Sequence, residues 1–275
     1  MAINDMLLRV LTVLAIALFS NCLINGNNPP LDSANAPTVL NHQKEITVFS
    51  NIDDALKTPL TAKALYLRDD TIQHINPRII ELKNLERVSF IRLSLLDLPD
   101  ALKKLSYLQI TELELIDCNI ERLPDVIDQL KSLETLICID DSFSLLTPNI
   151  CSLKNLKNLV VGTALDNLPS EIGKLKNLER LIISENKFTI IPNEICQLSN
   201  LVELSLEYNR INSVKAFPEC MSQLKKLKSL RLANNPIADR EFRSLETYGK
   251  LNELQVLQEN LPNCKVFVYR ILSHK

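Results

Sequence analysis

One short apolar template occurs eight times along this chain, and successive copies begin 22 to 26 residues apart. Apolar side chains recur at the first, fourth and sixth positions of each copy. A unit of this size cannot bury its own apolar face, so neighbouring units must stack on one another. The copies begin at Ala62, Leu85, Ile110, Leu133, Leu156, Leu178, Leu201 and Leu227.

The first part of each repeat has the alternation of a β-strand. In the seventh repeat, Leu204 and Leu206 alternate with Glu203 and Ser205, which places the leucines inward and the polar residues outward. A proline such as Pro192 then ends the strand, and the apolar spacing that follows favours a short helical turn. We therefore predict an α/β solenoid, a horseshoe with a concave parallel β-sheet and short helices or turns on its convex side.

Asparagine occupies the ninth position of the last three repeats, at Asn186, Asn209 and Asn235. A side-chain amide at this bend can donate to and accept from backbone groups of the neighbouring turn. Two earlier repeats have Leu93 and Ala164 there, and neither side chain can form those bonds. We therefore expect the least regular loops between residues 93 and 168.

The sequence divides into three parts. Residues 1–21 are predicted to be a signal peptide, because their apolar run of about ten residues is too short to span a bilayer of about 30 Å. Residues 22–44 lack apolar periodicity and suit a flexible tether. The remaining chain is the repeat domain, with an N-terminal cap at 45–61, eight repeats at 62–249 and a C-terminal cap at 250–275.

Both ends of a repeat stack expose apolar core unless a cap covers them. Ser50 and Asp53 have the spacing of a capping box ahead of a short helix. At the other end, apolar residues spaced by three predict a helix over residues 250–260. Residues 265–269 form a short apolar run, which predicts a final edge strand.

Cys22 follows an apolar segment, at the position where bacterial lipoproteins carry their acylated cysteine. The residues before it resemble the loose lipobox of spirochaetes, and Phe19 and Asn21 depart from the stricter pattern of other bacteria. We expect lipidation at Cys22 and a place at the outer membrane or cell surface. The alternatives are a secreted or periplasmic protein without the lipid and an uncleaved membrane anchor.

The six later cysteines are spread along the repeats, with no C-x-x-C spacing. Cys151 and Cys196 occupy the same template position two repeats apart, about 10 Å, which is beyond disulfide reach. We expect buried free thiols, and Cys196 with Cys220 is the one pairing that the spacing leaves open.

Charge and composition argue against several functions. The net charge of −2 gives no electrostatic signature for nucleic acid. Only three histidines occur, none with metal-ligand spacing to a cysteine, and four glycines are too few for a phosphate-binding loop. We therefore expect no enzyme, no cofactor and no metal site, and a membrane association only through a lipid at Cys22.

The sixth repeat, Leu178-x-x-Leu181-x-Ile183-x-x-Asn186, followed by Phe188, Ile191, Pro192, Ile195 and Leu198, resembles the 23-residue bacterial leucine-rich repeat. The stretches at 168–178, 52–60 and 261–267 are similar to the spirochaetal, specifically leptospiral, branch of that family. The resemblance covers residues 45–272. It implies an exported or surface-exposed protein that engages host or envelope proteins.

Outward strand positions in the middle repeats carry aliphatic residues instead of polar ones. Side by side, they would form an apolar patch about 20 Å wide with several hundred Å² exposed. The members of this predicted patch are Ile91, Ile116, Ile137, Ile139, Val160 and Ile182. A mixed-charge rim is expected from Arg68, Arg87, Arg92, Glu112, Glu114, Asp117, Asp140, Arg180, Glu203 and Tyr208.

An apolar centre with a polar rim is typical of a protein interface, so the patch predicts a protein ligand. The alternative is that strand propensity or a shifted register explains these residues. We predict a surface-exposed or secreted protein-binding module. A structural envelope protein, including a weakly self-associating homodimer, and an adaptor or inhibitor of an exported enzyme are the other interpretations.

Overall fold

The computed structural model describes residues 47–68, 71–139, 142–238 and 253–268. The predicted signal peptide, Cys22 and the tether lie outside these residues. So do Asp140 of the expected rim and part of the predicted C-terminal cap.

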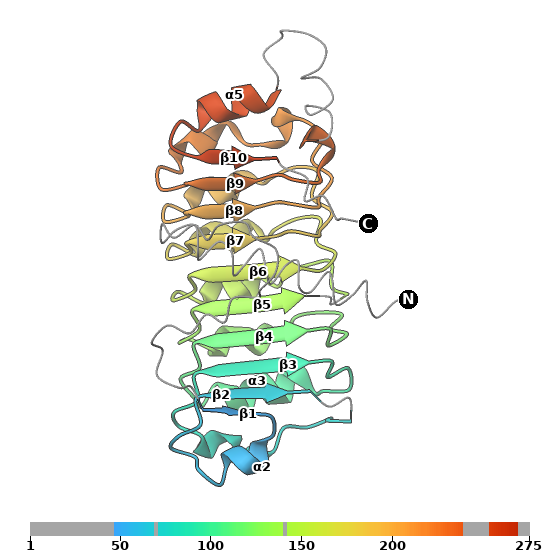
Figure 1. Cartoon of the computed structure of the whole chain (residues 1–275), viewed down its shortest axis with the longest axis vertical. Helices are drawn as coiled ribbons and strands as arrows, with labels where there is room; N and C mark the ends of the chain where they lie inside the picture. The colour runs from blue at the N-terminus through green and yellow to red at the C-terminus, as the bar shows by residue number, and fades with distance from the viewer. Residues whose placement is uncertain (1–46, 69–70, 140–141, 239–252, 269–275) are drawn as a thin grey trace, which may run out of the picture.

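The described strands form one parallel sheet in which every strand pairs with its neighbour in sequence order (Figure 1). This confirms the predicted α/β solenoid. The register matches equivalent template positions, so that Leu136 lies opposite Leu159 and Leu159 opposite Leu181. The strands are β1 (Val48–Phe49), β2 (Ala64–Leu67), β3 (Arg87–Ile91), β4 (Glu112–Ile116), β5 (Thr135–Ile139), β6 (Asn158–Gly162), β7 (Arg180–Ile182), β8 (Glu203–Ser205), β9 (Ser229–Arg231) and β10 (Lys265–Phe267).

Short helices follow the strands on the convex side, mostly as single 3₁₀ turns begun by proline. The predicted turn after Pro192 is η5, whose N-terminal residue follows the proline directly. A fixed proline φ and a missing N–H suit the start of such a turn. The helices are η1 (Pro77–Glu81), α3 (Leu98–Leu105), η2 (Asp125–Gln129), η3 (Pro148–Ser152), η4 (Ser170–Lys174), η5 (Asn193–Gln197), η6 (Val214–Ala216) and η7 (Glu219–Gln223).

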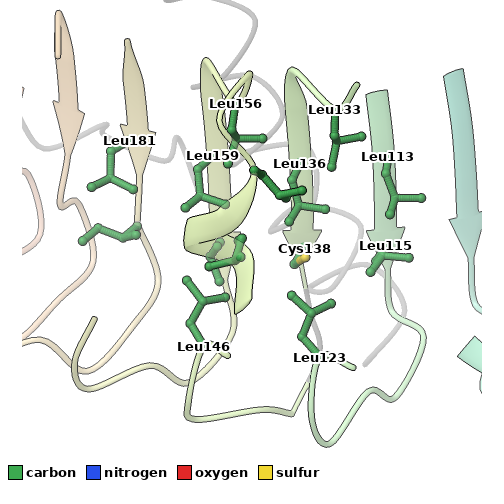
Figure 2. Packing of buried hydrophobic residues seen from close by; sticks show 14 of the residues in the cluster. Leu113, Leu115, Leu123, Leu133, Leu136, Cys138, Leu146, Leu156, Leu159 and Leu181 are labelled. Carbon is green, nitrogen blue, oxygen red and sulfur yellow. The ribbon is translucent and has the colours of Figure 1, made fainter. Parts of the chain in front are cut away.

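The apolar core lies between the sheet and these helices. Leu136, Leu159 and Leu181 point into it from consecutive strands, and Leu123 and Leu146 approach from the turns beyond the strands (Figure 2). All are buried, as the inward template positions predict. Each repeat therefore buries its apolar side chains against the next one, as the stacking argument requires.

The asparagines at the ninth position satisfy backbone groups inside the bend, as expected. The Nδ2 of Asn209 donates to the carbonyls of Ile183 and Leu206 at 2.8 and 3.0 Å, and its Oδ1 accepts from the N–H of Phe188 at 3.0 Å. Asn186 and Asn235 bond in the same way and are likewise buried.

The earlier repeats differ at this bend. The thiol of Cys118 takes the asparagine position and donates to the carbonyls of Phe90 and Ile116 at 3.3 and 3.5 Å. The second repeat also replaces the 3₁₀ turn by α3, whose N-cap Asp97 accepts from the N–H of Asp100. These departures fall within residues 93–168, where irregular loops were expected.

A second polar ladder lies at the return turns before the strands, and the sequence analysis missed it. The asparagine just before the first leucine of a repeat donates its Nδ2 to a carbonyl of the preceding turn, at N···O distances of 2.7–2.9 Å. These residues are Asn84, Asn155, Asn177 and Asn200. Both edges of the stack are therefore held by side-chain amides.

The caps follow the predicted plan with one correction. The N-terminal cap is β1 and the one-turn helix α2 (Ile52–Ala55), and its N-cap is Asn51, whose side chain accepts from the N–H of Asp54 at 2.7 Å. The predicted box of Ser50 and Asp53 is therefore wrong by one residue, because burial of Ile52 and Ala55 sets where the helix begins.

At the other end, α5 (Glu253–Asn260) and β10 confirm the expected helix and edge strand within the described residues. The first residues of the predicted helix lie outside them. Leu257 and Leu261 are buried, so this segment covers the end of the stack.

Two of the cysteines are bonded, in the one pairing that the sequence spacing left open. Cys196 and Cys220 form a disulfide with a Cα–Cα distance of 5.8 Å. They lie on the adjacent turns η5 and η7, and stacking brings these turns within bonding range. The expectation of buried thiols holds for Cys118, Cys138, Cys151 and Cys264.

We expect the double substitution Cys196→Ala, Cys220→Ala to lower the free energy of unfolding by about 3 kcal/mol, because the bond closes a loop between residues 24 positions apart. Urea denaturation of the oxidised proteins measures the difference. Reducing agent should destabilise the wild type by a similar amount and leave the variant unchanged. An unchanged wild type under reduction would contradict the prediction.

We also expect Asn209→Ala to cost about 2–3 kcal/mol, because it leaves buried carbonyl and N–H groups without partners. Asn177→Ala removes one exposed hydrogen bond and serves as the matched control, with a cost of about 1 kcal/mol or less. Urea midpoints of the two variants give the comparison. Equal costs would mean that the buried ladder is no more important than the exposed one.

Candidate protein-binding face

The outward positions of the sheet form one continuous concave face, made by the third, fifth and seventh residues of each repeat. The register aligns them across strands: Ser89 lies opposite Glu114, Glu114 opposite Ile137, Ile137 opposite Val160 and Val160 opposite Ile182. A second row aligns the seventh positions of β3 to β6, which include Ile91, Ile116 and Ile139. The predicted adjacency of the six aliphatic residues is therefore confirmed.

The expected exposure of this patch is wrong. Ile116, Ile137, Ile139, Val160 and Ile182 lie outside the core cluster, yet only 1–7% of each is exposed. Among the six, only Ile91 is half-buried. Strands about 4.8 Å apart press equivalent β-branched side chains against one another, and the inward curvature of the sheet draws their tips together. The patch therefore forms a closely packed floor and does not present several hundred Å² of apolar surface.

Charged residues at the N-terminal half of the face are paired across strands. The Nε of Arg87 donates to Glu112 at 2.7 Å, and Arg92 contacts Asp117 at 3.3 Å. The hydroxyl of Ser89 donates to Glu114. Burial raises the pKa of the Glu114 carboxyl, and the Ser89 hydrogen bond opposes that rise.

The C-terminal half holds a buried ion triad that the sequence analysis did not identify. Glu203 is only 2% exposed and accepts from Arg180 at 3.1 Å and from Arg231 at 3.2 Å. The guanidinium of Arg231 also lies 5.4 Å from the ring centre of Phe267. Arg180 and Glu203 share the third template position in adjacent repeats, and this spacing was the available signal. A buried carboxylate between two guanidiniums is held in one orientation.

Glu207 lies beside this triad and is also buried. Its carboxylate accepts from the hydroxyl of Ser205 at 3.4 Å, and Ser205 in turn bonds Ser184 at 3.0 Å. Burial raises the pKa of the Glu207 carboxyl above its usual value, and the charge of Arg231 opposes that rise.

The eighth residue of several repeats bends the chain away from the face in a left-handed conformation. Its φ lies between 54° and 58° at Arg92, Asp117, Glu185, Tyr208 and Asn234. In the first four of these, the backbone N–H donates to a carbonyl of the next repeat at 2.9–3.0 Å. This row therefore has a rigid backbone, although left-handed conformations are uncommon for such residues.

The predicted rim is only partly exposed: most of its described members are half-buried, and Glu203 is buried. Tyr208 is 38% exposed and Arg68, after β2, is exposed, whereas Glu114 is half-buried within the face. Cys22 and Asp140 lie outside the described residues. Within the eighth-position row, Tyr208 is exposed, whereas Arg92, Asp117, Glu185 and Asn234 are half-buried.

We searched the described residues for metal-binding groups, reactive thiols and membrane-spanning helices. They include no group of three His, Cys, Asp or Glu placed to hold a metal ion. Burial raises the pKa of the Cys151 thiol to about 11 and that of Cys264 to about 12, so neither is a thiolate near neutral pH. Among the described residues, no helix has the length and apolar character needed to cross a membrane.

A hollow of about 590 Å³ lies away from the concave face, at the loops of the third to fifth repeats. Its lining includes Arg122, Leu145, Thr147, Asn167 and Glu171.

We expect Glu207→Gln to raise the free energy of unfolding at neutral pH, because the wild-type carboxylate is ionised where burial disfavours charge. The raised folded pKa means that wild-type Glu207 takes up a proton in the folded state first. The advantage of the variant should therefore shrink as the pH falls towards the usual value of 4.5. Urea denaturation from pH 7 to 4.5 measures it, and a constant difference would refute the assignment.

Comparison with known proteins agrees with this architecture. A family model described as a leucine-rich repeat region matches residues 149–268. No curated protein sequence matches the chain. Among solved structures, a leucine-rich repeat protein of Leptospira interrogans is 24% identical, with a TM-score of 0.57 over 81% of this chain and 64% of that one.

Two further structures come from larger receptors. Toll of Drosophila, in complex with Spatzle, is 22% identical, with a TM-score of 0.55 over 64% of this chain and 24% of that one. TLR13, in complex with ssRNA13, is 20% identical, with a TM-score of 0.58 over 78% and 30%. This chain thus spans less than two thirds of each of the three proteins, and at these identities the likeness concerns the fold. The eight repeats and the parallel solenoid give this chain the fold of a leucine-rich repeat protein, and the family model for that repeat matches its C-terminal part.

Proposed function

We propose that this protein is a non-enzymatic module that binds another protein through its concave face, at the cell surface or after secretion. The partner is a host or envelope protein. The observation that carries the proposal is the cross-strand pairing of the charged side chains on this face, above all the triad of Arg180, Glu203 and Arg231.

Pairing of the charged side chains preorganises the concave face for binding. Ion pairs and hydrogen bonds already hold these side chains in one geometry, so a partner has little side-chain entropy to remove on association. A fixed pattern of charge also favours one partner over others. Since the aliphatic floor is nearly buried, recognition rests on the polar side chains of the face and on Tyr208, the exposed residue of the eighth-position row.

A protein ligand fits this chain better than RNA, although one structural neighbour was solved with ssRNA. The net charge of the chain is −2, which does not favour binding to a phosphate backbone. The Toll neighbour was solved with the protein Spatzle and offers the closer analogy.

An exported location is part of the proposal. A disulfide between Cys196 and Cys220 persists in oxidising compartments, and it agrees with the apolar leader and with acylation at Cys22. We propose a lipoprotein anchored at the cell surface through that cysteine.

The test uses the most exposed aromatic residue of the face. We expect Tyr208→Ala to weaken partner binding at least tenfold, because aromatic side chains at an interface commonly contribute more than about 1.4 kcal/mol. Affinity capture from extracellular host proteins and from envelope extract identifies partners, and surface plasmon resonance then measures each variant.

Tyr107→Ala is the matched control, because this tyrosine is 63% exposed and follows α3 on the convex side. It should bind as the wild type does. Equal affinity of the wild type and both folded variants would place the contact elsewhere and refute the concave assignment.

A further inference from the structure

A row of lysines lies along the edge of the sheet at which the strands begin. Each stands two residues before the first template residue of its repeat, and each is exposed. In Figure 1 this edge is the side formed by the tails of the strand arrows. The row consists of Lys83, Lys131, Lys154, Lys176 and Lys225.

The turns around this row add to its positive charge. We count three positions in each repeat: the two residues before its first template residue and the one residue after it. Over the eight repeats, these positions hold nine lysines and three glutamates, a net charge of +6. Because the whole chain carries −2, the rest of the sequence carries −8. The charge of the molecule is therefore separated, and we call this side the basic edge. Its lysines are Lys63, Lys83, Lys131, Lys154, Lys157, Lys176, Lys225, Lys226 and Lys228.

The ammonium groups of the row have no carboxylate partner among the described residues. Two of the three glutamates pair with lysines outside the row, Glu86 with Lys63 and Glu134 with Lys157. Lys154 and Lys176 donate only to backbone carbonyls, at 3.1 and 2.9 Å. Lys131, Lys154 and Lys176 thus hold like charges on three consecutive repeats, about 5 Å apart at the strand spacing. One repeat without a lysine at this position separates them from Lys83 and another separates them from Lys225.

The scaffold beneath the row is rigid. Asn155, Asn177 and Asn200 each donate to a carbonyl of the preceding turn, and the acceptors include Lys131, Lys154 and Lys176 themselves. The backbone of the lysine row therefore forms part of the second asparagine ladder. A rigid edge can bring several charges to a flat surface at once.

The chain enters the domain at this same edge. β1 is parallel to β2, with Val48 opposite Ala64, so its first residue lies on the side where all strands begin. Any anchor N-terminal to Thr47 therefore connects to the domain from the basic side. Because an N-terminal anchor and the lysine row lie on the same edge, a membrane is favoured over other polyanions as the partner of the row.

We propose that the basic edge docks on an anionic lipid surface and orients the repeat domain on the membrane that holds its N-terminus. The proposal rests on the anchoring at Cys22 proposed above. Docking at this edge leaves the concave face directed along the membrane and open to a partner. Each lysine near such a surface should strengthen binding about fivefold.

The test is co-sedimentation of the full chain with lipid vesicles, and the chain carries Cys22→Ala to prevent acylation. The vesicles contain phosphatidylcholine alone or phosphatidylcholine with about 30% phosphatidylglycerol, in buffer of about physiological ionic strength. We expect preference for the anionic vesicles. The edge variant Lys131→Glu, Lys154→Glu, Lys176→Glu should bind them on the order of 100-fold more weakly.

The matched control is Lys187→Glu, Arg210→Glu, Lys215→Glu, which makes the same change in net charge at exposed positions beyond the strands. It should retain most of the binding. Equal loss in both variants, equal binding to neutral vesicles, or stronger binding of the wild type to heparin than to anionic vesicles would overturn the proposal.

The outcome is independent of the concave face. Tyr208→Ala should bind anionic vesicles like the wild type, and the edge variant should still bind the protein partner. If Tyr208→Ala loses partner binding while the edge variant still binds anionic vesicles like the wild type, the concave site is supported and the membrane contact is refuted.

Discussion

The structure depends on the in-register stacking of equivalent strands, each hydrogen-bonded to the next along the whole described sheet. A parallel ladder of this kind needs long connections, and every repeat supplies one through a turn, a short helix and a return. The leucines at inward positions are buried only because the neighbouring repeat covers them. Each repeat is therefore stable through its contacts with the repeats beside it.

Side-chain amides provide hydrogen-bond partners for the backbone groups inside the bends. A chain that turns twice per repeat leaves carbonyl and N–H groups inside each bend, and Asn186, Asn209 and Asn235 satisfy them at one edge. Asn155 and Asn177 do so at the other. Cys118 shows that a thiol can take the donor role, which explains how a repeat without asparagine keeps its place in the stack.

The same regularity organises the surface. Equivalent positions of successive repeats lie one strand spacing apart, so residues distant in sequence become rows: ion pairs on the concave face and lysines on the basic edge. Arg180, Glu203 and Arg231 come from three repeats, yet they meet within 3.1–3.2 Å. A solenoid can thus hold one surface for a partner and another for a membrane, because its rows point in different directions.

The sequence by itself determined the repeat period, the parallel solenoid, the side to which each strand residue points and the asparagine ladder at the ninth position, because these depend on periodicity and on local hydrogen-bonding chemistry. Tertiary structure decided the rest. The exposure of Ile137 and Val160 depends on how closely neighbouring strands pack and curve, and the bond between Cys196 and Cys220 depends on how adjacent turns stack after a lengthened repeat. The start of α2 at Ile52 follows from burial against the first repeat. The sequence pattern specifies to which side each residue of a repeat points. The distances between residues of different repeats are set only when the repeats stack.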